Sequence, residues 1–212
     1  MERERVVVGV DEAGRGPVFG PVCVGALSVR AGGLKEFSRR VKGIRDSKKM
    51  SAMQRALWLR KLKELKREGL INFSRSFVGA KIIDERGIAK AVRTAVSRSL
   101  RKLSLNPKRC LILLDGSLRA PEKFENQKTI IGGDDIVRAI SSASVVAKES
   151  RDAKVLRLAK KYPGYGLEKH KGYGSREHFS ALRRRGLTPE HRRSFLSNSG
   201  LAATISDKGA NF

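Results

Sequence analysis

Apolar and polar positions follow two periods along this chain, one typical of strands and one typical of helices. Two β-branched, apolar runs separated by glycine and proline predict a pair of strands over residues 5–10 and 20–29, joined by a loop. Later apolar runs predict a buried strand over residues 109–116, a third strand over residues 70–80 and a weaker one over residues 127–134.

Apolar residues at helical spacing occupy the segments between these strands. Helices are predicted over residues 51–69, 81–103, 134–161, 175–186 and 188–195, the third of them beginning at Asp134 or Asp135. Ser51 is suited to capping the first, and Pro163 lies just beyond the end of the third. Strands and helices alternate, which is the pattern of an α/β fold.

The composition changes near residue 163, from regular alternation to glycine, tyrosine, histidine, lysine and arginine. We therefore expect a core over residues 1–162 and a helical extension over residues 163–196 that packs on it. Residues 197–212 have no periodicity and are predicted to form a flexible tail.

The charge of the chain points to a polyanionic partner. Its 46 lysines and arginines against 21 aspartates and glutamates give a net charge of +25. A soluble surface does not require so large an imbalance, so nucleic acid is the expected partner, ahead of an anionic membrane surface.

Several protein classes are excluded by the same sequence. No run approaches the ~18 consecutive apolar residues of a membrane span, and the first ten residues are charged where a signal peptide is apolar. Cys23 and Cys110 lie in strand-like apolar runs, so we expect them to be buried thiols of a cytoplasmic protein.

Acidic residues stand where predicted strands end and where a helix begins. Asp11 and Glu12 follow the first strand, Asp115 follows the apolar run near residue 110, and Asp134 or Asp135 opens the long helix. One such residue alone is most often a turn former or a helix cap. Four carboxylates gathered in a basic protein would repel one another unless a cation lay between them, and oxygen ligands suit Mg²⁺ or Mn²⁺. Two such ions serve phosphodiester hydrolysis.

The adjacent pair Asp11 and Glu12 raises a geometric difficulty. Neighbouring residues of a regular strand point to opposite faces, so both carboxylates could bind metal only if the strand breaks or twists there. We predict such an irregularity and regard Asp11 as the safer ligand.

A glycine-arginine-glycine triplet follows these acids directly. Gly14 and Gly16 let the main chain approach a partner closely, and Arg15 supplies several hydrogen-bond donors, so the triplet could clamp a nucleic-acid backbone or a sugar. A plain turn with a solvated arginine is the simpler interpretation. A dinucleotide-binding fingerprint would need a further glycine at position 19, which is Phe19.

Tyrosines and histidines are concentrated in residues 162–191. Tyrosines between basic residues suit stacking on a base or sugar, although for Tyr162 and Tyr165 we favour a structural role. The three histidines have no zinc-site spacing, so we expect them to form local hydrogen bonds or to contact phosphate.

Six ordered blocks of this sequence resemble the ribonuclease HII family over about residues 6–195. They are "GVDEAGRGPVFGPV", "DSKKMS", "LLDG", "GGDDIVRAISSASVVAKESRD", "HKGYGSREH" and "HRRSF". The resemblance implies a ribonuclease H-like fold, with a mixed sheet flanked by helices and a helical C-terminal extension. It also implies cleavage of the RNA strand of RNA/DNA hybrids and nicking 5′ of ribonucleotides embedded in duplex DNA.

The resemblance assigns roles to individual residues. It places two Mg²⁺ or Mn²⁺ ions on four carboxylates, those of Asp11, Glu12, Asp115 and, by the spacing to the following I-S-x-A-S pattern, Asp134 rather than Asp135. Its substrate-binding positions fall on five residues: Gly14, Arg15 and Gly16 at the 2′-OH, Tyr173 stacked on the following deoxyribose, and Lys48 at a phosphate. The 2′-OH distinguishes RNA from DNA at one site, so little dependence on base sequence is expected.

Two other classes remain as alternatives. A non-catalytic basic binder of nucleic acid would explain the charge but not the placement of the carboxylates. A Mg²⁺-dependent endonuclease specific for DNA, or a resolvase of similar fold, would explain both, but it would cut a duplex that contains no ribonucleotide. We expect a monomer, and no sliding-clamp partner, because residues 197–212 contain no glutamine-plus-aromatic clamp motif.

Overall fold

A computed structural model describes residues 5–196 and contains a five-stranded mixed sheet in the order β3-β2-β1-β4-β5. The strands are β1 (Val6–Ala13), β2 (Val22–Arg30), β3 (Ile71–Val78), β4 (Cys110–Asp115) and β5 (Gln127–Ile130). The first three pair antiparallel, whereas β4 runs parallel to β1 and β5 parallel to β4. The predicted strands and the mixed sheet are confirmed.

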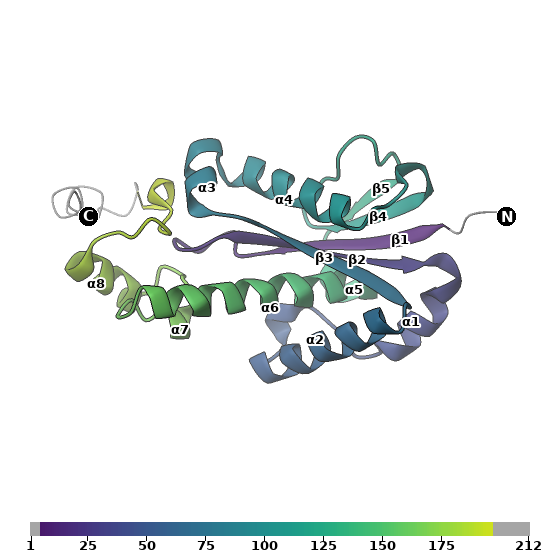
Figure 1. Cartoon of the computed structure of the whole chain (residues 1–212), viewed down its shortest axis with the longest axis horizontal. Helices are drawn as coiled ribbons and strands as arrows, with labels where there is room; N and C mark the ends of the chain where they lie inside the picture. Colours follow the sequence, from purple (N-terminus) through teal and green to yellow (C-terminus); the bar gives the residue numbers. More distant parts are fainter. Residues whose placement is uncertain (1–4, 197–212) are drawn as a thin grey trace.

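Helices cover both faces of this sheet (Figure 1). On one face lie α3 (Ala80–Arg86) and α4 (Ile88–Lys102), and on the other α6 (Arg138–Lys161) runs along the strands. On the side of α6 the sheet also carries α1 (Leu34–Arg40) and α2 (Ala52–Arg67).

Successive side chains of β1 point alternately to the two faces of the sheet. Val8 and Val10 lie in the core under α4, so Gly9 and Asp11 face α6. A Cβ on Gly9 would lie 2.1 Å from the carbonyl carbon of Ala139, so α6 packs directly on the strand backbone. The same alternation in β4 turns Leu114 toward α4 and Asp115 toward α6.

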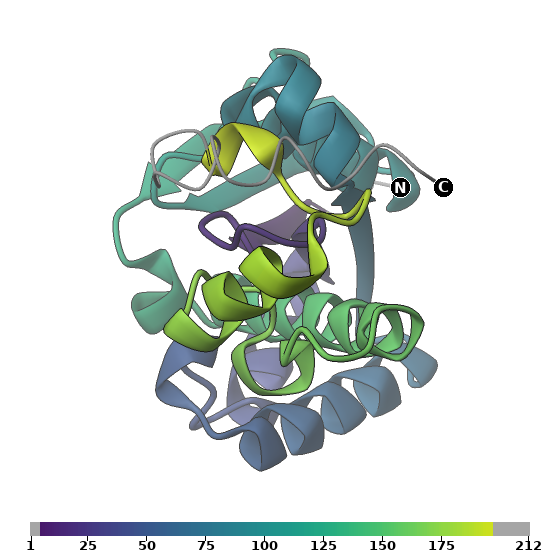
Figure 2. The ribbon, with the colours of Figure 1, turned by 90° about the vertical axis from the view of Figure 1, so that its left-hand side faces the viewer.

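The C-terminal segment lies against one end of the sheet (Figure 2). Besides the cores on the two faces of the sheet, a third core of buried side chains joins this segment to the rest of the chain. It combines the loop after β1 and the end of α6 with α7 (Leu167–His170) and α8 (Arg176–Arg185). Its buried apolar side chains are Val18, Phe19, Val155, Leu158, Tyr165, Leu167, Ala181, Leu182 and Leu196. Residues 163–196 therefore pack on the rest of the chain, while their status as a separate substrate-binding unit stays a prediction.

Two predicted helices are each divided in the structure. The helix expected over residues 81–103 is interrupted at Gly87, whose φ of +76° does not belong to a right-handed helix. The helix expected from residue 134 begins as a short α5 (Gly133–Ile136) and is interrupted at Val137, which has extended backbone angles. The interruption at Val137 turns α5 back toward the sheet, where the Asp134 N–H donates to Asp115.

Two other expectations from apolar periodicity are wrong. Residues 188–195 form no α-helix; their only helical element is the 3₁₀ turn Arg193–Phe195. Their main chain instead pairs with the loop after β1, which includes a β-bridge between Phe19 and His191. In α2, Leu62 and Leu65 are buried as expected, but Met53 and Leu57 are exposed because they lie on the opposite face of the helix from the buried positions. The helix α1 was not predicted from the sequence.

Smaller expectations have mixed outcomes. Cys23 and Cys110 are buried free thiols, as expected. Within residues 5–196, no helix combines the length and apolarity needed to cross a membrane. The predicted flexible tail and the absence of a clamp motif concern residues 197–212, which lie outside the described part of the chain.

Burial of two histidines in the third core generates a pH prediction. Burial lowers the pKa of His178 to about 4 and that of His191 to about 3. Both imidazoles are therefore neutral in the folded chain over the range where the unfolded chain binds protons, below its usual histidine pKa near ~6.5. The free energy of unfolding should fall by about 1.4 kcal/mol per pH unit for each histidine as the pH drops from ~6.5 to ~4.

Urea unfolding between pH 7.5 and pH 4.5 measures this slope in the wild type and in His178→Asn. The variant lacks one of the two protonation sites, so its stability should decrease less steeply with falling pH. Parallel curves for the two proteins would contradict the prediction.

Candidate active site

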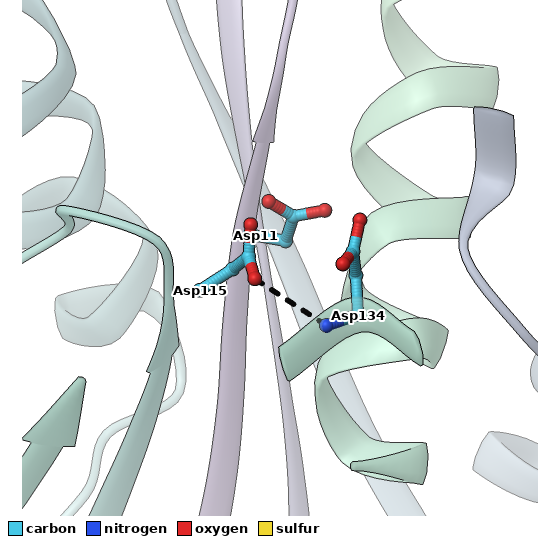
Figure 3. A group of neighbouring side chains, drawn as sticks. All are labelled: Asp11, Asp115 and Asp134. Atoms are coloured by element: carbon cyan, nitrogen blue, oxygen red, sulfur yellow. Dashed lines mark hydrogen bonds between the residues drawn. The ribbon is translucent and has the colours of Figure 1, made fainter. Parts of the chain in front are cut away.

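Three carboxylates meet beside the carboxyl end of β4 (Figure 3). Asp11 comes from β1, Asp115 ends β4 and Asp134 lies in α5, and each offers an oxygen within 4.8 Å of the others. The parallel pairing of Val10 with Leu114 makes Asp11 and Asp115 neighbours, and strand alternation turns both toward α6. The main-chain N–H of Asp134 donates to Asp115 Oδ1 at 3.3 Å, which ties α5 to the strand end.

This cluster is electrostatically strained in the absence of a cation. Asp11 is almost fully buried, and burial followed by the charge of Glu12 raises its pKa well above the usual value. Burial and the neighbouring Asp115 raise the pKa of Asp134 to about 6. One oxygen of Asp11 accepts the N–H of Glu12 at 2.7 Å, but Oδ2 is buried without a hydrogen-bond partner among the described residues. A buried carboxylate oxygen without a donor is suited to a cation.

The structure distinguishes the two adjacent aspartates of α5. Asp134 points into the carboxylate cluster, whereas Asp135 lies at the surface with its Oδ2 2.5 Å from Lys49 Nζ. The ion pair with Lys49 lowers the pKa of Asp135. Geometry therefore brings Asp134, the residue chosen from the sequence, to the cluster.

Glu12 lies apart from the three aspartates because β1 remains regular. Asp11 pairs with Gly25 and Glu12 with Val24 in an unbroken register that extends to Ala13, so the strand does not break there; of the predicted break or twist, the break is wrong and the twist stays a prediction. The cause is the partner strand β2, which supplies ladder partners along the whole of β1. Glu12 consequently points to the opposite face, and its Oε1 lies 3.2 Å from Arg15 Nη1.

A further acid, Asp46, was missed in the sequence. It is buried beside Asp134 and contributes to the raised pKa of that residue. Its Oδ1 accepts the N–H of Lys48 at 2.9 Å and so shapes the turn that presents Lys48. Lys48 Nζ is exposed and lies 3.7 Å from Asp134 Oδ2. An acid at the start of the "DSKK" block was the available signal.

Residues 14–20, here called the GRG loop, join β1 to β2 next to this cluster. Arg15 is exposed and its Nη1 contacts Glu12 Oε1 at 3.2 Å and Ser117 Oγ at 3.4 Å. Gly14 has a φ of +85°, and a Cβ there would lie 1.9 Å from Arg151 Nε, so the interior of the protein requires this glycine.

Gly16 differs from Gly14 in this respect. It has no positive φ, and a Cβ at Gly16 would have no atom of the described protein within 4 Å. Packing therefore does not explain the absence of a side chain at this exposed position. Glycine in such a place leaves room for the close approach of a ligand.

Tyr173 lies in residues 170–175, here called the Tyr173 loop, which adjoins the GRG loop. The N–H of Val18 donates to the carbonyl of Gly172 at 3.0 Å, which links the two loops directly. Tyr173 is half exposed, at 49%, and its ring centroid lies 5.9 Å from the guanidinium carbon of Arg151. Tyr165, in contrast, is buried with its hydroxyl 3.0 Å from the carbonyl of Gly186, in the structural role expected for it.

Solved structures with the same architecture include enzymes of the ribonuclease H2 and H3 type. The ribonuclease H2 of Pyrococcus horikoshii OT3 aligns with a TM-score of 0.73 at 23% identity, covering 95% of this chain and 99% of that one. The crystal structure of Bst-RNase HIII in complex with Mn²⁺ aligns with a TM-score of 0.67 at 17% identity over 96% of this chain and 71% of that one. These likenesses establish the ribonuclease H-like fold.

Sequence comparison is more specific. The family model for ribonuclease HII matches residues 8–198. A ribonuclease HII of Prochlorococcus marinus (strain MIT 9312) is 42% identical over 197 residues, which cover 92% of this chain and 91% of that protein. One from Endomicrobium trichonymphae is 40% identical over 89% of this chain and 84% of its own. The chain therefore belongs to the ribonuclease HII family, whose activity is that of a ribonuclease H endonuclease acting on RNA/DNA hybrids.

Proposed function

We propose that this protein also nicks duplex DNA on the 5′ side of an embedded ribonucleotide, by two-metal-ion hydrolysis that leaves a 3′-OH and a 5′-phosphate. The observation that carries the proposal is the juxtaposition of the GRG loop with a carboxylate cluster that contains a buried oxygen without a hydrogen-bond partner among the described residues. The cluster is suited to hold the reacting phosphate through metal ions, and the loop to inspect the adjoining sugar.

The residues of the cluster fit hard divalent cations. Three carboxylates within 4.8 Å, one with a buried and unpartnered oxygen, form the all-oxygen donor set that Mg²⁺ and Mn²⁺ prefer. Asp11, Asp115 and Asp134 would hold the ions. Glu12 points to the opposite face of β1, but its charge already raises the Asp11 pKa, and its side chain would have to turn toward the cluster to be a fourth ligand. Such ions activate water for in-line attack and stabilise the leaving oxygen. The Mn²⁺ complex of Bst-RNase HIII, which shares the fold, supports this choice of metal.

Sugar recognition is assigned to the GRG loop. Gly16 leaves open space at the surface, and Arg15 presents an exposed guanidinium beside the cluster, so a ribose 2′-OH can approach main-chain and side-chain donors together. Deoxyribose lacks this hydroxyl and would leave those donors unmatched, which is a strong basis for discrimination.

Two further residues are assigned to the flanking backbone. Lys48 carries a positive charge beside Asp134; partial burial disfavours that charge, but Asp46, Asp11 and Asp134 outweigh the burial and raise the Lys48 pKa. It is placed to contact a phosphate. The half-exposed Tyr173 ring would stack on the deoxyribose that follows the ribonucleotide.

The adjacent aspartates of α5 provide a matched test of the metal site. Asp134→Asn should lower the cleavage rate about 10³-fold, since losing a metal ligand removes ~4 kcal/mol of transition-state stabilisation. Asp135→Asn makes the same change at an exposed ion pair and should retain the rate within about threefold.

The cleavage rates of both variants and of the wild type are measured with Mg²⁺ or Mn²⁺ on three duplexes. The first duplex contains no ribonucleotide, the second contains one ribonucleotide and the third contains a full RNA strand. The wild type should cut the second and third and leave the first intact. Cutting of the all-DNA duplex would favour the DNA-specific nuclease, and binding without any cutting would favour the non-catalytic binder.

Stability provides a test of metal binding that does not depend on activity. The raised pKa of Asp11 means that its ionised form destabilises the folded chain at neutral pH. In EDTA, Asp11→Asn should therefore raise Tm by about 2–4 °C, the shift that ~1 kcal/mol produces in a chain of this size. Mn²⁺ should raise the Tm of the wild type well above that of the variant; an equal rise in both would argue against Asp11 as a ligand.

The open space at Gly16 generates a prediction about substrate approach. Gly16→Ala should leave Tm within about 1 °C, because the added methyl contacts no protein atom, yet lower kcat/KM on the one-ribonucleotide duplex by about 10-fold to 100-fold. Gly79→Ala is the control, since Gly79 also has ordinary φ and open space but lies before α3. Unchanged cleavage by Gly16→Ala would exclude close substrate contact at this residue.

A further inference from the structure

Residues 188–192, from the "HRRSF" end of the chain, have no part in the function described so far. We propose that His191 and Arg192 are positioning residues that hold the GRG loop and the Tyr173 loop in one fixed arrangement, each residue fixing one loop. The proposal rests on the proposed function for its consequence, because the two loops are those assigned to the sugar and its neighbour. The geometry itself is independent of that assignment.

Arg192 holds the GRG loop by its main-chain carbonyls. Its side chain is completely buried; Nη2 donates to Gly14 O at 2.7 Å, Nη1 to Arg15 O at 2.9 Å and Nε to Gly20 O at 2.9 Å. Two main-chain bonds reinforce this contact, Arg192 N to Val18 O and Gly20 N to Glu190 O, both at 2.8 Å.

The burial of this cation is unusual because no described carboxylate lies within ion-pair distance of it. Burial, with the nearby charge of Arg151, lowers its pKa to about 9, so it remains protonated at neutral pH. A buried charge is tolerated when its hydrogen bonds are satisfied, and here the loop carbonyls satisfy it. Folding of the guanidinium into the interior therefore requires this particular loop conformation.

The orientation of those carbonyls decides what the loop presents outward. In a trans peptide the C=O of one residue and the N–H of the next point in opposite directions, and the described chain contains no cis peptide. With the carbonyls of Gly14 and Arg15 bound to Arg192, the N–H groups of Arg15 and Gly16 point away from it. Both residues are exposed, and neither N–H has a hydrogen-bond partner among the described residues. Arg192 thereby directs two main-chain donors toward the substrate side.

His191 fixes the Tyr173 loop through a directional relay of hydrogen bonds. The main-chain N–H of Thr188 can only donate, and it donates to His191 Nδ1 at 2.9 Å. A neutral His191 then carries its proton on Nε2, which lies 3.2 Å from Nε2 of His178. His178 must accept there and carry its own proton on Nδ1, which donates to the carbonyl of Tyr173 at 2.9 Å.

The tautomer of His170, in the Tyr173 loop, is also determined by its main-chain partners. The N–H of Gly172 donates to His170 Nδ1 at 3.2 Å, so His170 donates from Nε2 to the carbonyl of Tyr165 at 2.8 Å. All three tautomers are thus determined by main-chain groups with fixed roles. The low pKa values of His178 and His191 agree with this neutral relay.

Arg151 of α6 joins the two loops from the other side. Its buried guanidinium donates from Nη1 to Lys171 O at 3.0 Å and from Nη2 to Phe19 O at 3.2 Å. The two loops are therefore held between α6 and residues 188–192. Loss of either support should let the loops move relative to each other.

The first experiment tests the relay in the wild type and uses no substrate. Long-range ¹H–¹⁵N spectra of ¹⁵N-histidine protein at pH 7 report which ring nitrogen is protonated. We expect His178 as the Nδ1–H tautomer and His170 and His191 as Nε2–H tautomers. A different tautomer at His178 or His191 would overturn the relay, whether or not the protein nicks ribonucleotides.

The second experiment compares Arg192→Lys with Arg193→Lys. Lysine keeps the charge, but one ammonium nitrogen cannot reach the three carbonyls bound by three guanidinium nitrogens. Arg192→Lys should lower kcat/KM on the one-ribonucleotide duplex about 10²-fold, as expected for a displacement near 1 Å, and leave affinity for an all-DNA duplex within about twofold. Arg193 is the adjacent, exposed residue and should tolerate the change.

If Arg192→Lys and Arg193→Lys lowered cleavage equally, the role of Arg192 would be overturned. The same holds if Arg192→Lys weakened binding of the all-DNA duplex as much as it lowered cleavage. Failure of the wild type to cut the one-ribonucleotide duplex would instead count against the proposed function. The histidine relay would still be tested separately by the tautomers seen in the spectra.

A double-mutant cycle tests whether His178 acts through Tyr173. His178→Phe removes the donor to Tyr173 O, whereas His178→Asn offers an amide N–H near the position of Nδ1. We expect His178→Phe alone to lower cleavage of the one-ribonucleotide duplex about 10-fold relative to the wild type, whereas His178→Asn should retain most of the wild-type rate. In a protein that already carries Tyr173→Ala, adding His178→Phe should lower the rate little further. The same loss in both backgrounds would show a merely structural role and overturn the relay's function.

Discussion

The parallel pairing of β1 with β4 is the constraint on which this molecule depends. It places Asp11 beside Asp115, and strand alternation turns both carboxylates toward the face that α6 covers. Neighbouring buried carboxylates repel each other and lose hydration, which is why the pKa of Asp11 is raised and one of its oxygens has no described partner. The fold thus maintains an arrangement that is unfavourable until cations bind.

The surrounding helices serve this arrangement by close approach. Gly9 lets the backbone of α6 lie directly on β1, and the interruption at Val137 lets α5 turn so that Asp134 reaches the strand ends. A continuous helix from residue 134 would have carried that carboxylate in a different direction. The exclusion of Asp135 follows from the same turn, which leaves it at the surface with Lys49.

Two buried guanidiniums fix the conformation of the loops beside the carboxylate cluster. Arg151 and Arg192 bind main-chain carbonyls and so fix backbone direction in loops that have no regular secondary structure. Donors of a loop can discriminate a sugar hydroxyl only when they are held before the substrate arrives. The basic charge can attract any nucleic acid, so under the proposed function discrimination between sugars depends on the few groups held in this way.

The sequence by itself determined the order of most strands and helices along the chain, the α/β class, the resemblance to ribonuclease HII and, with that resemblance, the three aspartates of the carboxylate cluster. It could do so because strand and helix periods and ordered motifs are local properties. The tertiary structure decided what depends on distant partners: β2 keeps β1 regular through Glu12, and pairing with the GRG loop keeps residues 188–192 from forming a helix. It also assigned partners to Arg192, His178 and His191, whose hydrogen bonds join residues far apart in the chain and leave no periodic signal in the sequence.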